Sequence, residues 1–290
     1  MTSQVPLVIY HKNCQDGFMS AAIAYQYLVI EGEYKDVELL PTSYGDEPPD
    51  TKDRDVFVLD MSYPRDQMIK MHSDAKKMVV LDHHKTAQED CIGLDFCIFN
   101  TTECGATLTW KFFYGEEEVP EVVRFVRDRD LWLHELPYTK EVSAALMSYE
   151  HDIEAWATLI NAAANILALE GKSILRHIQN YSRVVAQEAQ FNEILGRPAA
   201  YLNIPYPNAS DVLAMVLEDN PQIEVAIGYC RLADGSYHHT LRSRSTDDVD
   251  VSKIAKIFGG GGHRCAAGFV REDDLVRYLK THKDEHTSRE

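Results

Sequence analysis

The sequence predicts an α/β fold in which a doubly wound parallel sheet domain is followed by a helical connector and a smaller C-terminal α/β domain. Short apolar runs of strand length alternate with segments of helix length through the first half of the chain, a pattern typical of parallel sheets with crossover helices. Residues 141–195 then show helical periodicity almost throughout, and strand patterns return after Pro198. These patterns divide the chain into a first domain at residues 1–148, a connector at 149–197 and a second domain at 198–290.

The three strongest strand patterns lie at residues 6–10, 56–59 and 78–81, because each is a short apolar run that stops at a polar residue. Helices are predicted between them at residues 17–31 and 64–77. The remaining elements expected are strands at 37–40 and 96–99, helices at 106–114 and 121–129, and, in the second domain, a strand at 199–204, a helix at 211–217, a hairpin of 224–232 with 237–242, and a helix at 251–258.

Length, composition and charge limit the classes of protein that this chain can be. With 290 residues and 45% hydrophobic side chains, it is large enough for two packed domains. Because no apolar run approaches the roughly 20 residues that span a bilayer, and no basic segment starts a signal peptide, we expect a cytoplasmic protein. Six cysteines without a C-x-x-C pair argue against a disulfide framework or a zinc ribbon. The net charge of -17 argues against a protein that coats long DNA or RNA.

Polar side chains follow each of the three strongest strands at the point where the strand ends. His11 and Asp16 follow the first, Asp60 follows the second, and a run of Asp, His and His at 82–84 follows the third. Because ligands bind at the carboxyl ends of strands in an open α/β sheet, we expect these residues at the mouth of a site. Imidazole and carboxylate ligands together predict a metal site for Mn²⁺, with Mg²⁺, Fe²⁺ and Zn²⁺ as alternatives, in which one Asp can bridge two ions.

A second polar group is predicted in the C-terminal domain. The four glycines at 259–262 have no Cβ, so their backbone N–H groups can approach an anion closely, although a glycine run alone is also typical of a flexible turn. The predicted hairpin delivers basic and hydroxyl side chains as well, which favours a phosphate cradle. The candidate substrate-binding residues are Arg242, Ser243, Gly260, Gly261, Gly262, His263 and Arg264.

Both groups resemble motifs of a known family. The triplet Asp82, His83 and His84 resembles the motif that names the DHH phosphoesterase superfamily. The glycine run with His263 resembles the glycine-rich motif of the associated DHHA1 substrate domain, and the two motifs stand in the order and at about the distance expected of that family. Its members include short-RNA exonucleases called nanoRNases, the RecJ nuclease, family II pyrophosphatases and exopolyphosphatases.

The resemblance implies roles for individual residues. Asp82 is expected to fix His83 as a partner outside the ligand set, and His84 is expected to reach the phosphate of the substrate. Relatives place a further metal-binding Asp four positions before an aromatic residue, which fits Asp128, with Asp130 as the competing choice. An ion pair with a neighbouring Arg is the alternative role for either carboxylate. The ligands implied for one or two ions are His11, Asp16, Asp60, His83 and Asp128.

One position departs from the family pattern. Relatives begin with His followed by two Asp separated by one residue, whereas here Cys14 stands where the first acid is expected, two residues before Asp16. As a thiolate ligand, Cys14 would shift the metal preference toward Fe²⁺ or Zn²⁺. Two other interpretations stay open: Cys14 does not bind and one metal site is weak, or Cys14 packs beneath the site.

These observations together predict a metal-dependent phosphohydrolase or phosphodiesterase, similar to the nanoRNases, that acts on short oligonucleotides or small nucleotide phosphates. Two alternatives stay open, a pyrophosphatase or exopolyphosphatase and a nucleotide-binding regulator that has lost turnover through the change at Cys14. We expect the substrate to be an anion gripped at one end over a few phosphates in a cleft between the domains. We expect no coating of long nucleic acid and no membrane partner, with a homodimer as the candidate assembly.

Overall fold

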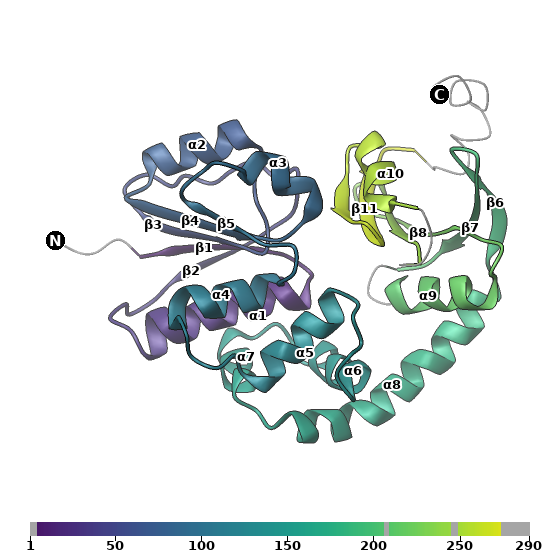
Figure 1. Ribbon diagram of the computed structural model, residues 1–290, viewed down its shortest axis with the longest axis horizontal. Helices are drawn as coiled ribbons and strands as arrows, with labels where there is room; N and C mark the ends of the chain where they lie inside the picture. Colours follow the sequence, from purple (N-terminus) through teal and green to yellow (C-terminus); the bar gives the residue numbers. More distant parts are fainter. Residues whose placement is uncertain (1–4, 206–208, 245–248, 274–290) are drawn as a thin grey trace. The chain divides into compact units, whose positions relative to one another are not determined.

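The computed structural model describes residues 5–205, 209–244 and 249–273. The chain divides into two compact units, unit 1 (Met1–Leu175) and unit 2 (Arg176–Glu290), which appear with their elements labelled in Figure 1. The division falls inside the stretch 149–197 that the sequence analysis treats as a connector. The boundaries at 148 and 197 stay predictions.

Unit 1 is built on a five-stranded parallel sheet, which confirms the predicted fold class (Figure 1). The strand order is β2-β1-β3-β4-β5, so the chain adds β2 on one side of β1 and then returns to place β3 on the other. This order puts the topological switch point between β1 and β3, where open α/β sheets bind ligands at the carboxyl ends of the strands. The strands are β1 (Leu7–His11), β2 (Glu38–Thr42), β3 (Asp55–Leu59), β4 (Lys77–Asp82) and β5 (Cys97–Phe99).

Helices cover both faces of this sheet, as a doubly wound fold requires. Figure 1 shows α2 and α3 on one face and α1 and α4 on the other. The helices are α1 (Gln15–Tyr25), which continues into the π-helical turn η1 (Gln26–Ile30), α2 (Arg65–Asp74), the 3-10 turn η2 (Lys85–Ala87), α3 (Gln88–Cys91), α4 (Gly105–Tyr114), α5 (Glu121–Asp130), α6 (Thr139–Ser148), α7 (Ile153–Ile160) and α8 (Ala164–Ala186), whose last turns lie in unit 2.

The two faces of the sheet bury alternate residues of each strand. In β1, Val8 and Tyr10 pack into the core that includes α1 and α4, whereas Leu7 and Ile9 pack into the core that includes α2. A strand buried on both faces has no polar side, so it appears in the sequence as a continuous apolar run. This burial explains why residues 6–10 could be identified as a strand from the sequence.

The helical stretch after α5 differs in part from the prediction. We expected helix through residue 195, but α8 ends at Ala186, and β6 (Gln190–Ile194) follows and pairs antiparallel with β7 (Arg197–Asn203). Leu195 and Gly196 both have positive φ, at 49° and 74°, as the two-residue turn of a tight hairpin requires. The hairpin pairing therefore overrides the helical pattern of this segment.

Unit 2 contains a six-stranded mixed sheet with the order β10-β11-β9-β8-β7-β6. One core lies against α10 and another against α9, so this sheet is also buried on two faces. None of the helices in the described part of the chain is both long enough and apolar enough to cross a membrane. The remaining elements are α9 (Ala209–Asp219), β8 (Val225–Arg231), β9 (Tyr237–Arg242), α10 (Val251–Ile257), β10 (Gly261–His263) and β11 (Ala266–Arg271).

Candidate metal centre

The carboxyl ends of β1, β3 and β4 lie side by side in unit 1. The strand register pairs Tyr10 with Leu59 and Leu59 with Leu81, so the three strands end at the same level. The residues that come next are therefore carried to one edge of the sheet. His11 ends β1, Asp60 follows β3, and the Asp-His-His triplet follows from the last residue of β4. Because β1 and β3 flank the switch point, this edge is the expected ligand-binding edge of the fold.

The backbone at Asp60 is held in an unusual conformation. Asp60 has a φ of 59°, in the left-handed region that non-glycine residues seldom adopt, and its N–H donates to the carbonyl of Leu81 at 2.9 Å. Gly105 lies directly against it, since a Cβ at position 105 would come within 2.4 Å of the Asp60 Cβ. Strained residues of this kind persist where the surrounding structure fixes them, and they are concentrated at functional sites.

Six side chains meet at this edge, and we call them the candidate metal centre. They form two groups of three, and within each group the potential ligand atoms lie within 4.8 Å of one another. The first group is His11, Asp60 and His84, and the second is Asp16, His83 and Asp130.

Asp60 connects the two groups through its two oxygens. Its Oδ1 lies 2.9 Å from His83 Nε2, and its Oδ2 lies 3.5 Å from His11 Nδ1. The same His83 nitrogen is 3.5 Å from Asp16 Oδ2 and 3.7 Å from Asp130 Oδ2. Asp60 is thus placed where a carboxylate that bridges two ions would be.

The charges of the centre are out of balance. Burial disfavours a charged His83, but its hydrogen bond to Asp60 and three neighbouring carboxylates outweigh burial and raise the pKa of His83 to about 10. Burial would likewise raise the pKa of Asp60, yet the adjacent imidazoles hold that pKa well below its usual range. Burial and neighbouring negative charge raise the pKa of Asp16 well above its usual range, and they also raise the pKa of Asp130. A divalent cation would supply the positive charge that these carboxylates lack.

Unpaired ligand atoms give a direct test of whether the residues fit a metal ion. Among the described residues, His11 Nδ1, Asp60 Oδ2 and Asp130 Oδ2 are buried and have no hydrogen-bond partner. Leaving such a group unpaired costs roughly 1–3 kcal/mol, so native structures seldom do so without a reason. Two ligands that each lie about 2.1 Å from one ion at a tetrahedral angle are about 3.4 Å apart, close to the 3.5 Å between His11 and Asp60. The donor atoms and their spacing therefore fit a metal ion.

Asp16 is fixed by the amino end of α4. Its two oxygens accept the backbone N–H groups of Gly105 at 2.6 Å and Ala106 at 2.7 Å. Free N–H groups at a helix N-terminus favour a negative charge. The contact holds the carboxylate toward His83 and joins α1, which carries Asp16, to α4.

Asp82 orients the second histidine of the triplet. Its Oδ1 lies 2.9 Å from His84 Nδ1 and accepts the backbone N–H groups of His83 at 2.7 Å and His84 at 3.0 Å. The resemblance to the DHH family implies that Asp82 fixes the ring of His83. In the structure, Asp82 contacts the ring of His84, and the ring of His83 contacts Asp60.

The two competing carboxylates at the end of α5 have different surroundings. Asp128 accepts the N–H groups of Glu135 at 2.9 Å and Leu136 at 3.3 Å, and the hydroxyl of Thr139 at 2.5 Å. It therefore holds the loop that follows the helix. Asp130 is the carboxylate that approaches His83, so we carry Asp130 forward as the candidate ligand in place of Asp128.

Comparisons with known proteins agree with this architecture. No family model matches the chain. The uncharacterized protein R106 of Acanthamoeba polyphaga mimivirus is 28% identical over 302 residues, which cover 92% of this chain and 68% of that protein. An exopolyphosphatase-related protein from Bacteroides fragilis matches with a TM-score of 0.53 and 11% identity, over 98% of this chain and 92% of its own.

Two further solved structures match over nearly the whole chain. The pGpG-specific phosphodiesterase PggH from Vibrio cholerae has a TM-score of 0.51 and 12% identity, over 98% of each chain. RecJ from Thermus thermophilus, solved in complex with Mn²⁺, has a TM-score of 0.50 and 15% identity, over 95% of this chain and 51% of its own. The chain has the fold of the DHH phosphoesterases.

The departure from the DHH pattern at Cys14 lies beside the candidate metal centre. Cys14 is the N-cap of α1, and its neighbour Asn13 has a φ of 58°. Burial, followed by the charges of Asp60, Asp130 and Asp16, raises the pKa of the Cys14 thiol well above its usual range. This direction favours the neutral thiol over the thiolate, so a role of Cys14 as a metal ligand stays a prediction.

In unit 2 of the DHH fold, the predicted substrate-binding side chains make contacts within the unit. The Arg242 guanidinium donates to Ser210 Oγ at 2.5 Å and to the carbonyl of Leu241 at 2.9 Å. The Ser243 hydroxyl donates to the carbonyls of Val249 at 3.3 Å and Arg264 at 3.5 Å. These contacts hold the end of β9, so a role in substrate binding stays a prediction.

Close packing of the backbone also explains part of the glycine run in unit 2. A Cβ at position 260 would lie 2.0 Å from the carbonyl oxygen of Gly268, and Gly262 has a φ of 135° in β10. The N–H of Gly260 donates to the carbonyl of Ala255 at 2.9 Å. His263 ends β10 opposite Ala266. The close approach of β10 to β11 therefore accounts for two of the glycines, while an anion cradle with Gly261, His263 and Arg264 stays a prediction.

One aromatic side chain at the candidate metal centre was missed. Tyr44 follows β2, and its ring contacts the rings of His11 and His84. A single tyrosine in a loop belongs to no metal or catalytic motif, so no residue pattern distinguishes it.

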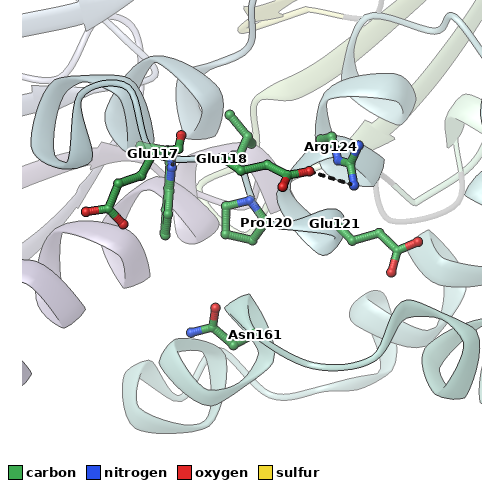
Figure 2. Close-up of a pocket in the computed structure, with 8 residues that line it drawn as sticks. Glu117, Glu118, Pro120, Glu121, Arg124 and Asn161 are labelled. Atoms are coloured by element: carbon green, nitrogen blue, oxygen red, sulfur yellow. Dashed lines mark hydrogen bonds and ion pairs between the residues drawn. The ribbon is translucent and has the colours of Figure 1, made fainter.

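A separate pocket in unit 1 is a poor candidate for an anionic ligand. Its volume is about 530 Å³, and Figure 2 shows the glutamates among its lining residues, with Glu118 in an ion pair with Arg124 at 3.9 Å. The lining contains three glutamates and one arginine, so the local field repels phosphate. None of the lining residues belongs to the candidate metal centre; they are Trp110, Glu117, Glu118, Val119, Pro120, Glu121, Arg124 and Asn161.

Proposed function

We propose that this protein is a metal-dependent phosphoesterase that hydrolyses short oligonucleotides or small nucleotide phosphates. The observation that carries the proposal is the placement of Asp60 between two groups of buried ligand atoms, with one of its oxygens toward each group. The DHH fold supports it, because a phosphodiesterase and a Mn²⁺ complex of RecJ are among the structures that share the fold. Mn²⁺ is the proposed ion, with Mg²⁺, Fe²⁺ and Zn²⁺ as alternatives.

The proposed ligands divide between two positions that share Asp60. His11 would hold one ion, and Asp16, His83 and Asp130 would hold the other. Bound ions would polarise the phosphoryl oxygens and lower the pKa of a bound water, which is the chemistry that hydrolysis of a phosphate ester needs.

The remaining residues of the centre orient the ligands and the substrate. Asp82 holds Nδ1 of His84, which fixes the orientation of the imidazole. His84 Nε2 is proposed to donate to a phosphate oxygen of the substrate, where a hydrogen bond stabilises the negative charge that develops on the phosphoryl group. The hydrogen bonds from Gly105 and Ala106 keep Asp16 in place as a ligand, and a bound cation would favour its charged form.

The overall charge of the protein limits the substrate that we propose. A net charge of -17 repels an extended polyanion, so favourable contacts must be concentrated at a few phosphates near the ions. The preferred substrates should therefore run from dinucleotides to about pentanucleotides. A shallow salt dependence of KM should accompany this preference, since each phosphate contact adds a slope of roughly 0.7 on a logarithmic scale for single strands.

The test is a substrate panel assayed with added Mn²⁺ and repeated with EDTA. The panel contains a dinucleotide, a pentanucleotide, an RNA of about 20 nucleotides, pyrophosphate and polyphosphate, and product release gives kcat/KM for each. We expect the dinucleotide and the pentanucleotide to be cleaved in a metal-dependent reaction. Equal kcat/KM for the 20-nucleotide RNA and the dinucleotide would contradict the short-substrate proposal.

Other results of the panel would select the alternatives. Phosphate release from pyrophosphate or polyphosphate with no nucleotide turnover would assign a pyrophosphatase or exopolyphosphatase. Tight dinucleotide binding without turnover of any substrate would identify a nucleotide-binding regulator. Isothermal titration of the dinucleotide against the Mn²⁺-loaded protein separates the regulator from a protein that does not bind nucleotides.

A further inference from the structure

Tyr44 completes a set of three rings at the candidate metal centre. The centroids of Tyr44 and His11 are 5.7 Å apart, those of Tyr44 and His84 are 5.5 Å apart, and those of His11 and His84 are 5.5 Å apart. The three interplanar angles lie between 70° and 80°, so each ring meets the other two edge to face. Pairs in this geometry attract each other beyond the effect of burial alone. Tyr44 is therefore in contact with both imidazoles of the first ligand group.

The loop that carries Tyr44 is held by a polar clamp. Asp46 Oδ2 accepts the N–H of Ser43 at 2.8 Å and pairs with the Lys12 ammonium at 3.3 Å, while the N–H of Asp46 donates to the Ser43 carbonyl at 3.1 Å. Lys12 directly follows His11, so the clamp connects this loop to the end of β1. Gly45 has a φ of 94°, which the turn requires and which a side chain would oppose. The position of Tyr44 is thus set by its loop as well as by its ring contacts.

The ring of Tyr44 packs against the imidazole that Asp82 orients. Asp82 Oδ1 lies 2.9 Å from Nδ1 of His84, and the same imidazole is in edge-to-face contact with Tyr44. Tyr44 and Asp82 therefore restrain the same imidazole, one through its ring and the other through a hydrogen bond.

We propose that Tyr44 is a positioning residue that holds the imidazoles of His11 and His84 in the orientation needed for metal and phosphate contact. The ring restricts rotation of both imidazoles. This inference rests on the proposed function, and it names a residue that acts through its neighbours without itself binding the ion. Partners of this kind typically contribute 10- to 100-fold to metal affinity or activity.

The test compares variants of Tyr44 with a matched tyrosine. Tyr44→Ala removes the ring and the hydroxyl, and Tyr44→Phe removes the hydroxyl alone. Tyr27→Ala is the control, because Tyr27 is 40% exposed, against 42% for Tyr44, and also makes two ring contacts, with Phe113 and Tyr114, outside the candidate metal centre. Isothermal titration of Mn²⁺ into each metal-free protein gives the affinity without any assay of turnover, and kcat and KM are measured on a dinucleotide.

The expected results follow from the ring contacts. Tyr44→Ala should bind Mn²⁺ about 10- to 100-fold more weakly than wild type and should lower kcat more than it raises KM. Tyr44→Phe should stay within about threefold of wild type in kcat and in Mn²⁺ affinity, because the ring contacts remain. Tyr27→Ala should match wild type in both measurements. Tyr44→Leu, which keeps apolar bulk without a ring, replaces Tyr44→Ala if circular dichroism shows that the alanine variant is unfolded.

Three outcomes would overturn the proposal. Unchanged Mn²⁺ affinity with only a raised KM would make Tyr44 a substrate contact. Equal loss of affinity in the Tyr44 and Tyr27 variants would show general loosening of unit 1. Equal behaviour of Tyr44→Ala and Tyr44→Phe would place the whole effect in the hydroxyl. Absence of turnover in wild type refutes the proposed function instead, and the Mn²⁺ titrations still decide the role of Tyr44.

Discussion

The carboxyl edge of the unit 1 sheet and the glycine-rich edge of the unit 2 sheet both carry the polar residues expected of a binding site, but the two edges use their polar atoms differently. In unit 1, His11 Nδ1 and Asp60 Oδ2 face each other at 3.5 Å and have no hydrogen-bond partner. In unit 2, the guanidinium of Arg244 donates to the carbonyls of Leu217, Ile223 and Asn220 at the end of α9. Buried ligand atoms left over after folding indicate a site for another group, whereas a guanidinium paired with carbonyls indicates a structural role.

Backbone conformation separates the same two regions. Two of the positive-φ residues other than glycine, Asn13 and Asp60, lie at the candidate metal centre, and three more, Trp132, His134 and Tyr138, lie in the loop after α5 that Asp128 holds. In unit 2, the positive φ at Leu195 belongs to a hairpin turn that any tight β-hairpin requires. The positive φ of Asp60, which directly follows β3, has no hairpin turn to explain it, so this backbone strain lies within the candidate metal centre itself.

The largest effect is expected from Asp60→Ala. Loss of the shared carboxylate removes a charge from both proposed ion positions, so kcat with Mn²⁺ should fall by at least about 1,000-fold, equivalent to ~4 kcal/mol in barrier height. Asp53→Ala is the matched control, because Asp53 also has a φ of 58° but is exposed, so both variants place alanine at a positive φ. Retention of more than about a tenth of kcat, a loss below ~1.4 kcal/mol, would show that Asp60 is not a ligand.

Arg244→Ala tests whether the guanidinium in unit 2 stabilises the fold and does not bind the substrate. Three carbonyls would lose a part-buried, charged donor, so the free energy of unfolding should fall by about 1–2 kcal/mol, while KM stays near the wild-type value. Urea denaturation measures the change. The control is Arg197→Ala, because the Arg197 side chain is 45% exposed and pairs with Glu224 at the surface, where such pairs contribute ~1 kcal/mol or less. A large rise in KM at unchanged stability would instead assign Arg244 to substrate binding.

Cys14→Asp tests the departure from the DHH pattern. If the thiol faces the ions, a carboxylate in its place should strengthen Mn²⁺ binding by about tenfold and weaken the preference for Fe²⁺ and Zn²⁺, because oxygen ligands suit Mn²⁺ and sulfur ligands suit the other two. Metal titrations of wild type, Cys14→Asp and Cys14→Ser provide the measurement, since the serine variant removes the thiol without adding charge. Superimposable titrations for all three metals would make Cys14 a packing residue.

Most of the sheet of unit 1 and much of its site could be predicted from local patterns. The runs that end at His11, Asp60 and Asp82 are strands buried on both faces, so their limits and their polar ends are visible in the sequence. The choice between Asp128 and Asp130 could not be made in this way. Two positions in a helix differ by about 200° in direction, and only tertiary packing decides which one faces His83.

Contacts between distant segments account for the other differences from the sequence analysis. Tyr44 reaches the site through its loop contacts with Asp46 and Lys12, which no residue pattern indicates. Gln190–Ile194 has a helical pattern but becomes β6 because β7 offers it a paired strand. In unit 2, the glycine run indicated an anion site in the sequence, and the structure adds the close approach of Gly260 to Gly268 as a second reason for the same residues.

The smallest effect is expected from a carboxylate of unit 1 that accepts both of its hydrogen bonds through one oxygen. Asp55, at the start of β3, accepts the Tyr34 hydroxyl at 2.7 Å and the Lys76 ammonium at 3.1 Å through Oδ2. Burial alone would raise its pKa, but these two contacts hold the pKa of Asp55 below its usual range. Asp55→Asn should therefore lower the free energy of unfolding by about 1 kcal/mol at pH 7 and leave Mn²⁺ binding unchanged.

The pH dependence of this loss follows from the direction of the pKa shift. Because the pKa of Asp55 is lower in the folded protein than in the unfolded chain, the ionised carboxylate stabilises the fold above about pH 4, and this contribution disappears as the pH falls through the folded-state pKa. Urea denaturation of metal-free wild type and Asp55→Asn at several pH values should show a difference that is largest near pH 7 and shrinks below about pH 4. Glu116→Gln, at an exposed position, is the control for loss of one negative charge. A difference that stays constant with pH would show that Asp55 contributes by shape and not by charge. Its contrast with Asp60, which directly follows the same strand, would then be one of packing alone.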